Sequence, residues 1–338
     1  MPIYDVTIRE LLKAFNDVSK DLDVIKGFAE GLEVEFSKLT PLRDDVFREV
    51  SASDSSTIHR GYEYMSLYII QGISIKYPGS PTRASPIVRT GAAHVKNIHL
   101  SSGREPEHVV ERKARMLSKL LELKLTEDSL ESNGGSLALF DGSLISFLSF
   151  GVKEERPELR SLWVEVRDRV RKLSKRATAV FVAKTIRLSH YIKKWFGDME
   201  EARRFNDIAV LNYARGIGKL PLEPHYVEPV IISDSRDLPE PLGKPGFELD
   251  EIIPMAVTYV SLGHGAPYYQ VTIPGVRGLG EVDSVVRSLM KYSRSGYPDP
   301  LRIAHHLCKL KASEVNALLL KVGFSILKTG REPLGEFT

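Results

Sequence analysis

The chain has 338 residues, of which 42% are hydrophobic and 27% are charged, with a net charge of only +3. This composition is typical of a folded, water-soluble protein with a sizeable core. The near-neutral charge excludes a chain-wide basic surface, so any contact with nucleic acid must be local. The single cysteine, Cys308, excludes an intramolecular disulfide and a cysteine zinc cluster. We see no signal peptide and no apolar stretch that could span a bilayer, so we expect a cytoplasmic protein without membrane contact.

The first third of the sequence changes from a helical pattern to a strand pattern. Residues 1–38 are expected to form a helical extension, because apolar residues recur at spacings of three and four. Residues 46–77 are rich in aromatic and β-branched residues and predict three strands, the first ending near Asp54 and the third beginning at Gly72. Residues 78–104 contain many Pro, Ser and Gly residues and predict a loop-rich, partly basic region.

The middle of the chain alternates between helices and buried strands. Apolar stripes predict helices over residues 105–125 and 158–176. Short apolar runs predict strands that lead into Asp141 and Lys184. Residues 144–150 are expected to continue as a further strand or to begin a hairpin.

The last third begins with a segment punctuated by proline. Residues 221–254 are interpreted as an insertion around one strand at 230–232. A hairpin is predicted over residues 255–273. Residues 282–327 predict a helical tail, interrupted at 293–300 by a glycine and prolines.

Asp141 is the most informative residue, because this carboxylate follows a buried apolar run and is itself followed by Gly142. A carboxylate at the end of a buried strand is costly to desolvate unless something pairs with it. A small residue after it lets another group approach the backbone. A divalent cation explains both features, and a turn aspartate after a strand is the ordinary alternative.

Possible partners for Asp141 lie on three other predicted elements: Asp54 in the early strands, Glu111 in the 105–125 helix and His305 in the tail. Carboxylates with one imidazole suit a hard cation, which favours magnesium or manganese over structural zinc. Two such ions would activate a water and stabilise the leaving oxygen of a phosphodiester.

Three motifs resemble the NurA nuclease family over about residues 40–320. They are Asp54 in Ser-Asp-Ser-Ser, Asp141 in Leu-Phe-Asp-Gly-Ser, and Tyr297 with His305 in Gly-Tyr-Pro-Asp-Pro-Leu-Arg-Ile-Ala-His. The last motif, in which the histidine follows the tyrosine by eight residues, is the most specific.

The resemblance implies one α/β domain, residues 1–338, built on an RNase H-like mixed sheet flanked by helices, with helical N- and C-terminal additions. Members of the family are manganese-dependent deoxyribonucleases that cut single-stranded DNA internally and degrade DNA from the 5′ end. They form homodimers and act with the hexameric HerA ATPase in DNA end resection for recombinational repair. The resemblance therefore implies Mn²⁺, with Mg²⁺ as the alternative, and an intracellular, archaeal protein.

The resemblance also implies roles for particular residues. The implied metal ligands are Asp54, Glu111, Asp141 and His305. Tyr297 would be a nearby catalytic or orienting residue. The first motif departs from the family pattern, because Ser55 stands where a glycine is usual. The choice of the first aspartate and of the glutamate is therefore open, and the rivals are Asp44, Asp45, Glu107 and Glu122.

Several basic and aromatic residues are candidates for DNA contact. Arg167, Arg171 and Lys175 lie on the basic side of the 158–176 helix, where a solvated face is the ordinary alternative. Lys184 either contacts phosphate or is a solvated end residue. Stacking on bases is considered for a few aromatic residues, with core packing as the alternative; these are Tyr62, Tyr64 and Phe147.

Two other functions stay open. One is a dimeric adaptor that docks on an ATPase ring, with an inactive or secondary nuclease site. The N-terminal helix and the proline-rich segment favour it, whereas the four hard-metal ligands argue against it, because a scaffold does not need them. The other is a nuclease for RNA or RNA–DNA hybrids, which contacts to the 2′-hydroxyl would distinguish.

Overall fold

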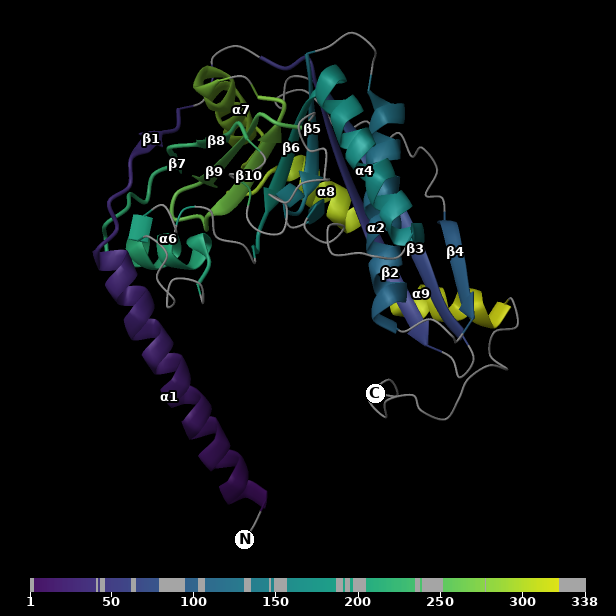
Figure 1. Cartoon of the computed structure of the whole chain (residues 1–338), viewed down its shortest axis with the longest axis horizontal. Coiled ribbons are helices and arrows are strands. Elements are labelled where there is room, and N and C mark those ends of the chain that lie inside the picture. Colours follow the sequence, from purple (N-terminus) through teal and green to yellow (C-terminus); the bar gives the residue numbers. More distant parts are fainter. Residues whose placement is uncertain are drawn as a thin grey trace.

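The computed structural model describes residues 3–40, 42, 46–61, 65–78, 95–102, 107–130, 135–145, 147–148, 157–186, 191, 195–196, 205–234, 238, 252–276 and 278–321. Within them, a ten-stranded mixed sheet has helices on both faces (Figure 1). The predicted α/β class is confirmed. None of the described helices combines the length and apolarity needed to cross a membrane. The assignment of the whole chain to one domain stays a prediction.

One half of the sheet has the strand order β4-β3-β2-β5-β6. β2 (Glu49–Gly61), β3 (Met65–Pro78) and β4 (Val95–Ser102) form an antiparallel meander. β5 (Ser136–Asp141) lies parallel to β2, and β6 (Thr178–Ala183) lies parallel to β5. This meander, extended by two parallel strands beside its first strand, is the RNase H-like core that was expected.

The sheet continues beyond β6 with antiparallel pairs. β10 (Tyr269–Pro274) joins β6 to β9 (Met255–Ser261), and β7 (His225–Val227) follows. β1 (Phe36–Lys38) pairs with β7, so the end of the predicted helical extension is a strand. β8 (Val230–Ile232) pairs with β9 and confirms the strand predicted in the proline-rich segment.

Alternation along β5 explains why the sheet is covered on both faces. Ala138 and Phe140 belong to one hydrophobic core, and Leu137 and Leu139 belong to the other. Successive strand residues point to opposite faces, so a continuous apolar run needs an apolar layer on each side.

Two groups of helices supply these layers. α2 (Glu107–Ser129), α4 (Pro157–Arg176) and α6 (Asp207–Gly216) contribute to the first core. α7 (Leu279–Lys291) and α8 (Asp299–Cys308) contribute to the second. The helices predicted over residues 105–125 and 158–176 are confirmed, as are the interrupted tail up to residue 321 and the hairpin that β9 and β10 form. Residues 322–327 of the predicted tail lie outside the described residues.

Two helices extend the body of the protein. α1 (Ile3–Glu30) projects away from the sheet, with its N-terminal end far from the core (Figure 1). Its last turns enter the core through Phe28 and Ala29. α9 (Ala312–Lys321) packs through Val315 and Leu319.

Four strand predictions were wrong. β2 continues seven residues past Asp54, and β3 is one strand through Gly72 rather than two. A Cβ on Gly72 would lie 2.9 Å from Leu121. The missing side chain therefore lets α2 pack closely against the sheet, and the glycine does not end a strand. The expected loop region contains β4. Residues 144–145 and 147–148 are helical, not extended.

Candidate metal centre

Asp54 and Asp141 are placed side by side by strand register. Ser53 of β2 lies opposite Phe140 of β5 in a parallel pair, so the next residue on each strand is an aspartate, and both point to the same face. β5 ends at Asp141, whereas β2 continues. The carboxylates therefore meet where β2 runs on past the end of its neighbour.

α8 brings His305 to this point. Gly296 has φ +79°, and a Cβ there would lie 2.6 Å from that of Ala266, so the turn before the helix requires glycine. His305 Nδ1 hydrogen-bonds Asp54 Oδ2 at 2.8 Å. Potential ligand atoms of Asp54, Asp141 and His305 all lie within 4.8 Å of one another.

The structure does not bring Glu111 to this cluster. Its side chain is half exposed and lies 4.0 Å from Arg115 one turn along α2. Glu122, the rival eleven residues later and about 16 Å along the helix, lies there instead. Glu107 begins α2 and is farther still from Glu122. Asp44 and Asp45 lie outside the described residues.

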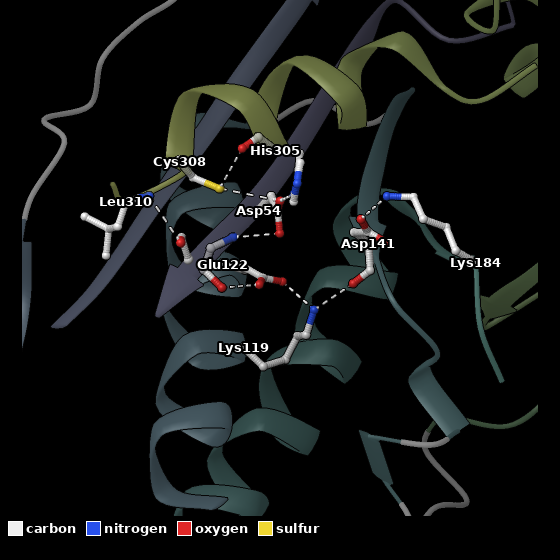
Figure 2. A network of polar contacts seen from close by, with 10 residues as sticks. Asp54, Lys119, Glu122, Asp141, Lys184, His305, Cys308 and Leu310 are labelled. Atoms are coloured by element: carbon white, nitrogen blue, oxygen red, sulfur yellow. Dashed lines mark hydrogen bonds and ion pairs between the residues drawn. The ribbon is translucent and has the colours of Figure 1, made fainter. Parts of the chain in front are cut away.

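Glu122 is buried among the site residues (Figure 2). It accepts hydrogen bonds from the Ser55 hydroxyl and from Lys119 Nζ. Burial raises the pKa of Glu122 to about 7, with Lys119 opposing the shift and Asp54 adding to it. The lysine and the hydroxyl therefore do not offset the cost of burying this carboxylate beside Asp54.

Two lysines lie beside the carboxylates. Lys119 Nζ, besides its bond to Glu122, donates to the Asp141 carbonyl at 3.1 Å. Lys184 Nζ lies 2.8 Å from Asp141 Oδ2, on the opposite side of Asp141 in Figure 2. Lys184 also lies 4.4 Å from the ring centre of Tyr297. The structure thus places Lys184 within the cluster.

Tyr297 lies beside the carboxylates. It is 8% exposed, and its ring contacts that of Tyr269. Burial, followed by the charges of Asp141 and Asp54, raises its pKa well above the ordinary range. Its hydroxyl is buried and interacts with the Asp141 carboxylate, which adds to the raised pKa. A neutral phenol therefore borders the site.

Cys308 completes the surroundings of Asp54. Its thiol donates to Asp54 Oδ2 at 3.5 Å, one turn of α8 after His305. Burial and the charges of Asp54 and Glu122 raise its pKa, so it remains a neutral donor. Cys308 and Lys119 are the two members that sequence reasoning missed. Their helical spacing from His305 and Glu122, three residues in each case, was the available signal.

The remaining DNA-contact candidates lie apart from this cluster. Arg167 Nη2 is 2.9 Å from Asp168, and its guanidinium lies 5.6 Å from the Trp163 ring centre. Arg171 and Lys175 follow it along α4. Their role in DNA binding stays a prediction. Tyr62 and Tyr64 lie outside the described residues.

A divalent cation fits the residues that meet here. Asp54, Glu122 and Asp141 are three carboxylates near two lysines, and burial, followed by the charge of Asp54, raises the pKa of Glu122. Carboxylate oxygens and one imidazole are donors that Mg²⁺ and Mn²⁺ accept. Among the described residues, Asp54, Asp141 and His305 offer ligand atoms close enough together to hold one ion.

The mixed sheet and the carboxylates beside its central strands define a protein of the RNase H-like class with a candidate divalent-metal centre. A family model, the NurA domain, matches residues 48–310, well over half of the chain. The chain belongs to the NurA family. No curated protein sequence matches it.

Solved structures show the same fold at low identity. The crystal structure of the NurA nuclease from Sulfolobus solfataricus is 17% identical, with a TM-score of 0.62 and coverage of 98% of this chain and 99% of that one. A structure of NurA with manganese is 12% identical, with a TM-score of 0.58 and coverage of 95% and 99%. NurA bound to dAMP and manganese is 12% identical, with a TM-score of 0.55 and coverage of 97% of each chain.

Proposed function

We propose that this chain is a metal-dependent deoxyribonuclease whose hydrolytic site contains Asp54, Glu122, Asp141, Tyr297 and His305. The observation that carries the proposal is the convergence of three carboxylates and a histidine beside two adjacent parallel strands. Membership of the NurA family supports it, as does the binding of manganese and dAMP by NurA structures of the same fold.

Each side chain has a distinct task in this proposal. Asp54 and Asp141 hold the divalent cation together with His305, and Glu122 takes the ligand role first predicted for Glu111. The bound cation supplies activation of the attacking water and stabilisation of the leaving oxygen. His305 is oriented through its Nδ1 bond to Asp54, which leaves Nε2 as the ring's other polar atom.

Tyr297 and Lys184 act on the phosphate in this proposal. The phenol is neutral and interacts with the Asp141 carboxylate, so it can donate to a phosphate oxygen that takes the place of this partner. Lys184 is held near the site by Asp141 and by the Tyr297 ring. Its 45% exposure allows it to exchange this partner for a phosphate.

The finer assignments rest on the family resemblance. We infer that manganese is the preferred ion and that the enzyme cuts single-stranded DNA internally and degrades DNA from the 5′ end. We also infer a homodimer that acts with a HerA-type ATPase in end resection. α1 supports an assembly role, because it carries exposed apolar residues on a projecting helix; these are Ile8, Leu12 and Leu22.

Digestion of end-labelled single- and double-stranded DNA tests the proposal. Wild type and Asp141→Ala are compared with manganese, with magnesium and with EDTA. Asp128→Ala, which removes an exposed carboxylate on α2, is the matched control. We expect metal-dependent cleavage by wild type and the control and none by Asp141→Ala. Equal cleavage by Asp141→Ala would show that this site is not the nuclease.

A dimeric adaptor for an ATPase ring is the second candidate, favoured by the exposed apolar residues of α1. It predicts no cleavage by wild type even with a HerA-type partner present. It also predicts that Leu12→Glu abolishes partner binding while Asp141→Ala does not.

A further inference from the structure

A row of side-chain hydrogen bonds joins α2 to β2. Each of three contacts links one residue of β2 to one residue of α2; they are Thr57 with Ser118 at 2.8 Å, Ser55 with Glu122, and Ser53 with Thr126 at 2.6 Å. We call these three contacts the hydroxyl ladder. Glu122, one of the carboxylates of the proposed hydrolytic site, forms its middle contact.

The hydroxyl ladder has a regular step. Successive contacts are two residues apart on β2 and four residues apart on α2, in opposite directions along the chain. Two strand residues span about 6.7 Å and four helix residues span about 6 Å, so the two elements keep nearly the same step. Hydrogen bonds are directional, whereas apolar contacts are not. The contacts therefore form together and favour one level of α2 against β2.

The contact between Ser53 and Thr126 lies in the interior, and both residues are 0% exposed. The Thr126 hydroxyl also lies 2.9 Å from the carbonyl oxygen of Glu122, which can only accept a hydrogen bond. A hydroxyl has one hydrogen, so Thr126 donates it to this carbonyl and accepts from Ser53. The hydrogen bonds thus run from β2 through Thr126 to the backbone of Glu122.

The carboxylate of Glu122 is held by the same strand. The Ser55 hydroxyl donates to this carboxylate, and the Ser55 N–H donates to Asp54 Oδ1 at 2.8 Å. Asp54 lies between Glu122 and His305 in Figure 2. The two residues that flank Asp54 on β2 therefore hold Glu122, one at its side chain and the other, through Thr126, at its backbone.

We propose that Ser53 and Thr126 are positioning residues that fix α2 at the level where the Glu122 carboxylate lies beside Asp54. The proposal rests on the proposed function, in which Asp54 and Glu122 both serve a divalent cation. Ser53 and Thr126 act through Glu122 and do not themselves contact the ion. Hydrogen-bond partners of metal ligands typically contribute about 10- to 100-fold to metal affinity or activity.

Manganese binding without DNA tests the role of Thr126. Thr126→Val keeps the branched shape of the side chain and removes the hydroxyl. The affinity for Mn²⁺ is measured from the electron paramagnetic resonance signal of the free ion. We expect about tenfold weaker binding by Thr126→Val, and binding within about twofold of wild type by Thr126→Ser, which restores the hydroxyl. Equal affinity in wild type and Thr126→Val would overturn the proposal.

Ser129→Ala is the matched control. Ser129 also joins α2 to β2, through a 3.0 Å hydrogen bond to Ser51, but it lies seven residues beyond Glu122. This variant removes the same kind of contact about two helical turns from the site. We expect its Mn²⁺ affinity to stay within about twofold of wild type. Equal weakening by Ser129→Ala and Thr126→Val would overturn the specific role of Thr126.

A double variant separates positioning from stability. Thr126→Val leaves the buried Ser53 hydroxyl without this acceptor, and adding Ser53→Ala removes that hydroxyl as well. The double variant should therefore unfold at a higher urea concentration than Thr126→Val alone. Its Mn²⁺ affinity should remain about tenfold below wild type, because the two residues act in one chain of bonds. Recovery of Mn²⁺ affinity together with stability, or a loss of about a hundredfold, would overturn the proposal.

Cleavage kinetics distinguish this proposal from the nuclease assignment. Thr126→Val should lower kcat and leave KM for DNA within about twofold of wild type. If Asp141→Ala abolishes cleavage but Thr126→Val binds Mn²⁺ and cleaves like wild type, the positioning proposal fails and the nuclease stands. If Asp141→Ala cleaves like wild type while Thr126→Val binds Mn²⁺ weakly, the nuclease assignment fails and the positioning of Glu122 stands.

Discussion

Asp207 and Glu122 are both buried carboxylates, and their surroundings differ in one respect. Asp207 is fully buried in the first turn of α6 and accepts a 3.0 Å bond from the Tyr191 N–H and another from the Tyr259 hydroxyl. Burial and Asp207 raise the pKa of Tyr259, so it remains a donor. Glu122 also accepts hydrogen bonds, but it lies beside a second carboxylate, that of Asp54.

The comparison shows that burial of a carboxylate does not by itself mark a functional site. Asp207 is surrounded by a backbone N–H, a phenol hydroxyl and the N-terminus of α6. These groups favour negative charge without any ligand. Glu122 is buried beside a second carboxylate, that of Asp54, and Lys119 does not lower the pKa of Glu122 to the ordinary value. Like charges concentrated in one place are what a cation would stabilise.

The largest expected effect comes from breaking the cluster at Asp54. Asp54→Asn keeps the shape of the side chain and removes the charge that would hold the cation. We expect cleavage to fall on the order of a thousandfold, about 4 kcal/mol in transition-state free energy. The free energy of unfolding should change little. Single-turnover cleavage and urea unfolding measure the two quantities, and a stable variant that retains full activity would remove Asp54 from the site.

Asp207→Ala should have the opposite signature. It leaves the Tyr191 N–H and the Tyr259 hydroxyl without their acceptor in a buried place, so we expect a loss of about 3 kcal/mol of stability. Cleavage per folded molecule should remain within about twofold of wild type. Urea unfolding and active-enzyme titration test this, and a large loss of activity in the folded fraction would contradict the structural role of Asp207.

Within the site, Asp141 and Asp54 differ in how easily they could be identified from the sequence. Asp141 was identifiable, because an aspartate that ends an apolar strand breaks a local rule and needs a reason. Asp54 was harder to choose, because β2 is polar where it passes the site: Ser51 and Ser53 face α2, and Ser53 bonds Thr126. Hydroxyl groups of α2 form hydrogen bonds with this polar face of β2, and only the tertiary structure shows that pairing.

The glutamate could not be chosen from periodicity. Glu111 and Glu122 are eleven residues apart, close to three full turns, so both lie on the same face of α2. Hydrophobic pattern gives the face of a helix but not the level at which a neighbour meets it. That level depends on the close approach of α2 to Gly72, a contact between distant parts of the chain.

Glu122→Gln sharpens the comparison through pH. The folded pKa of about 7 lies above the ordinary 4.5, so between these values the folded state holds a proton that the unfolded state has released. Stability therefore falls as pH rises through this window, by roughly 3 kcal/mol when complete. In EDTA, Glu122→Gln should be more stable than wild type at pH 8.5, with a much smaller difference at pH 5. Urea unfolding at both pH values measures this difference in stability. An equal difference at pH 5 and at pH 8.5 would contradict the cost of burying a charged Glu122.

Glu111→Gln should produce the smallest effect and serves as the control for Glu122→Gln. Glu111 is half exposed and lies 4.0 Å from Arg115, so its charge contributes at most about 0.5 kcal/mol to stability. Cleavage and manganese affinity should both stay within about twofold of wild type. Manganese titration of the two variants side by side decides between the rivals. If Glu111→Gln weakens manganese binding and Glu122→Gln does not, the ligand lies three turns earlier on α2, and the cluster around Asp54 is incomplete as described.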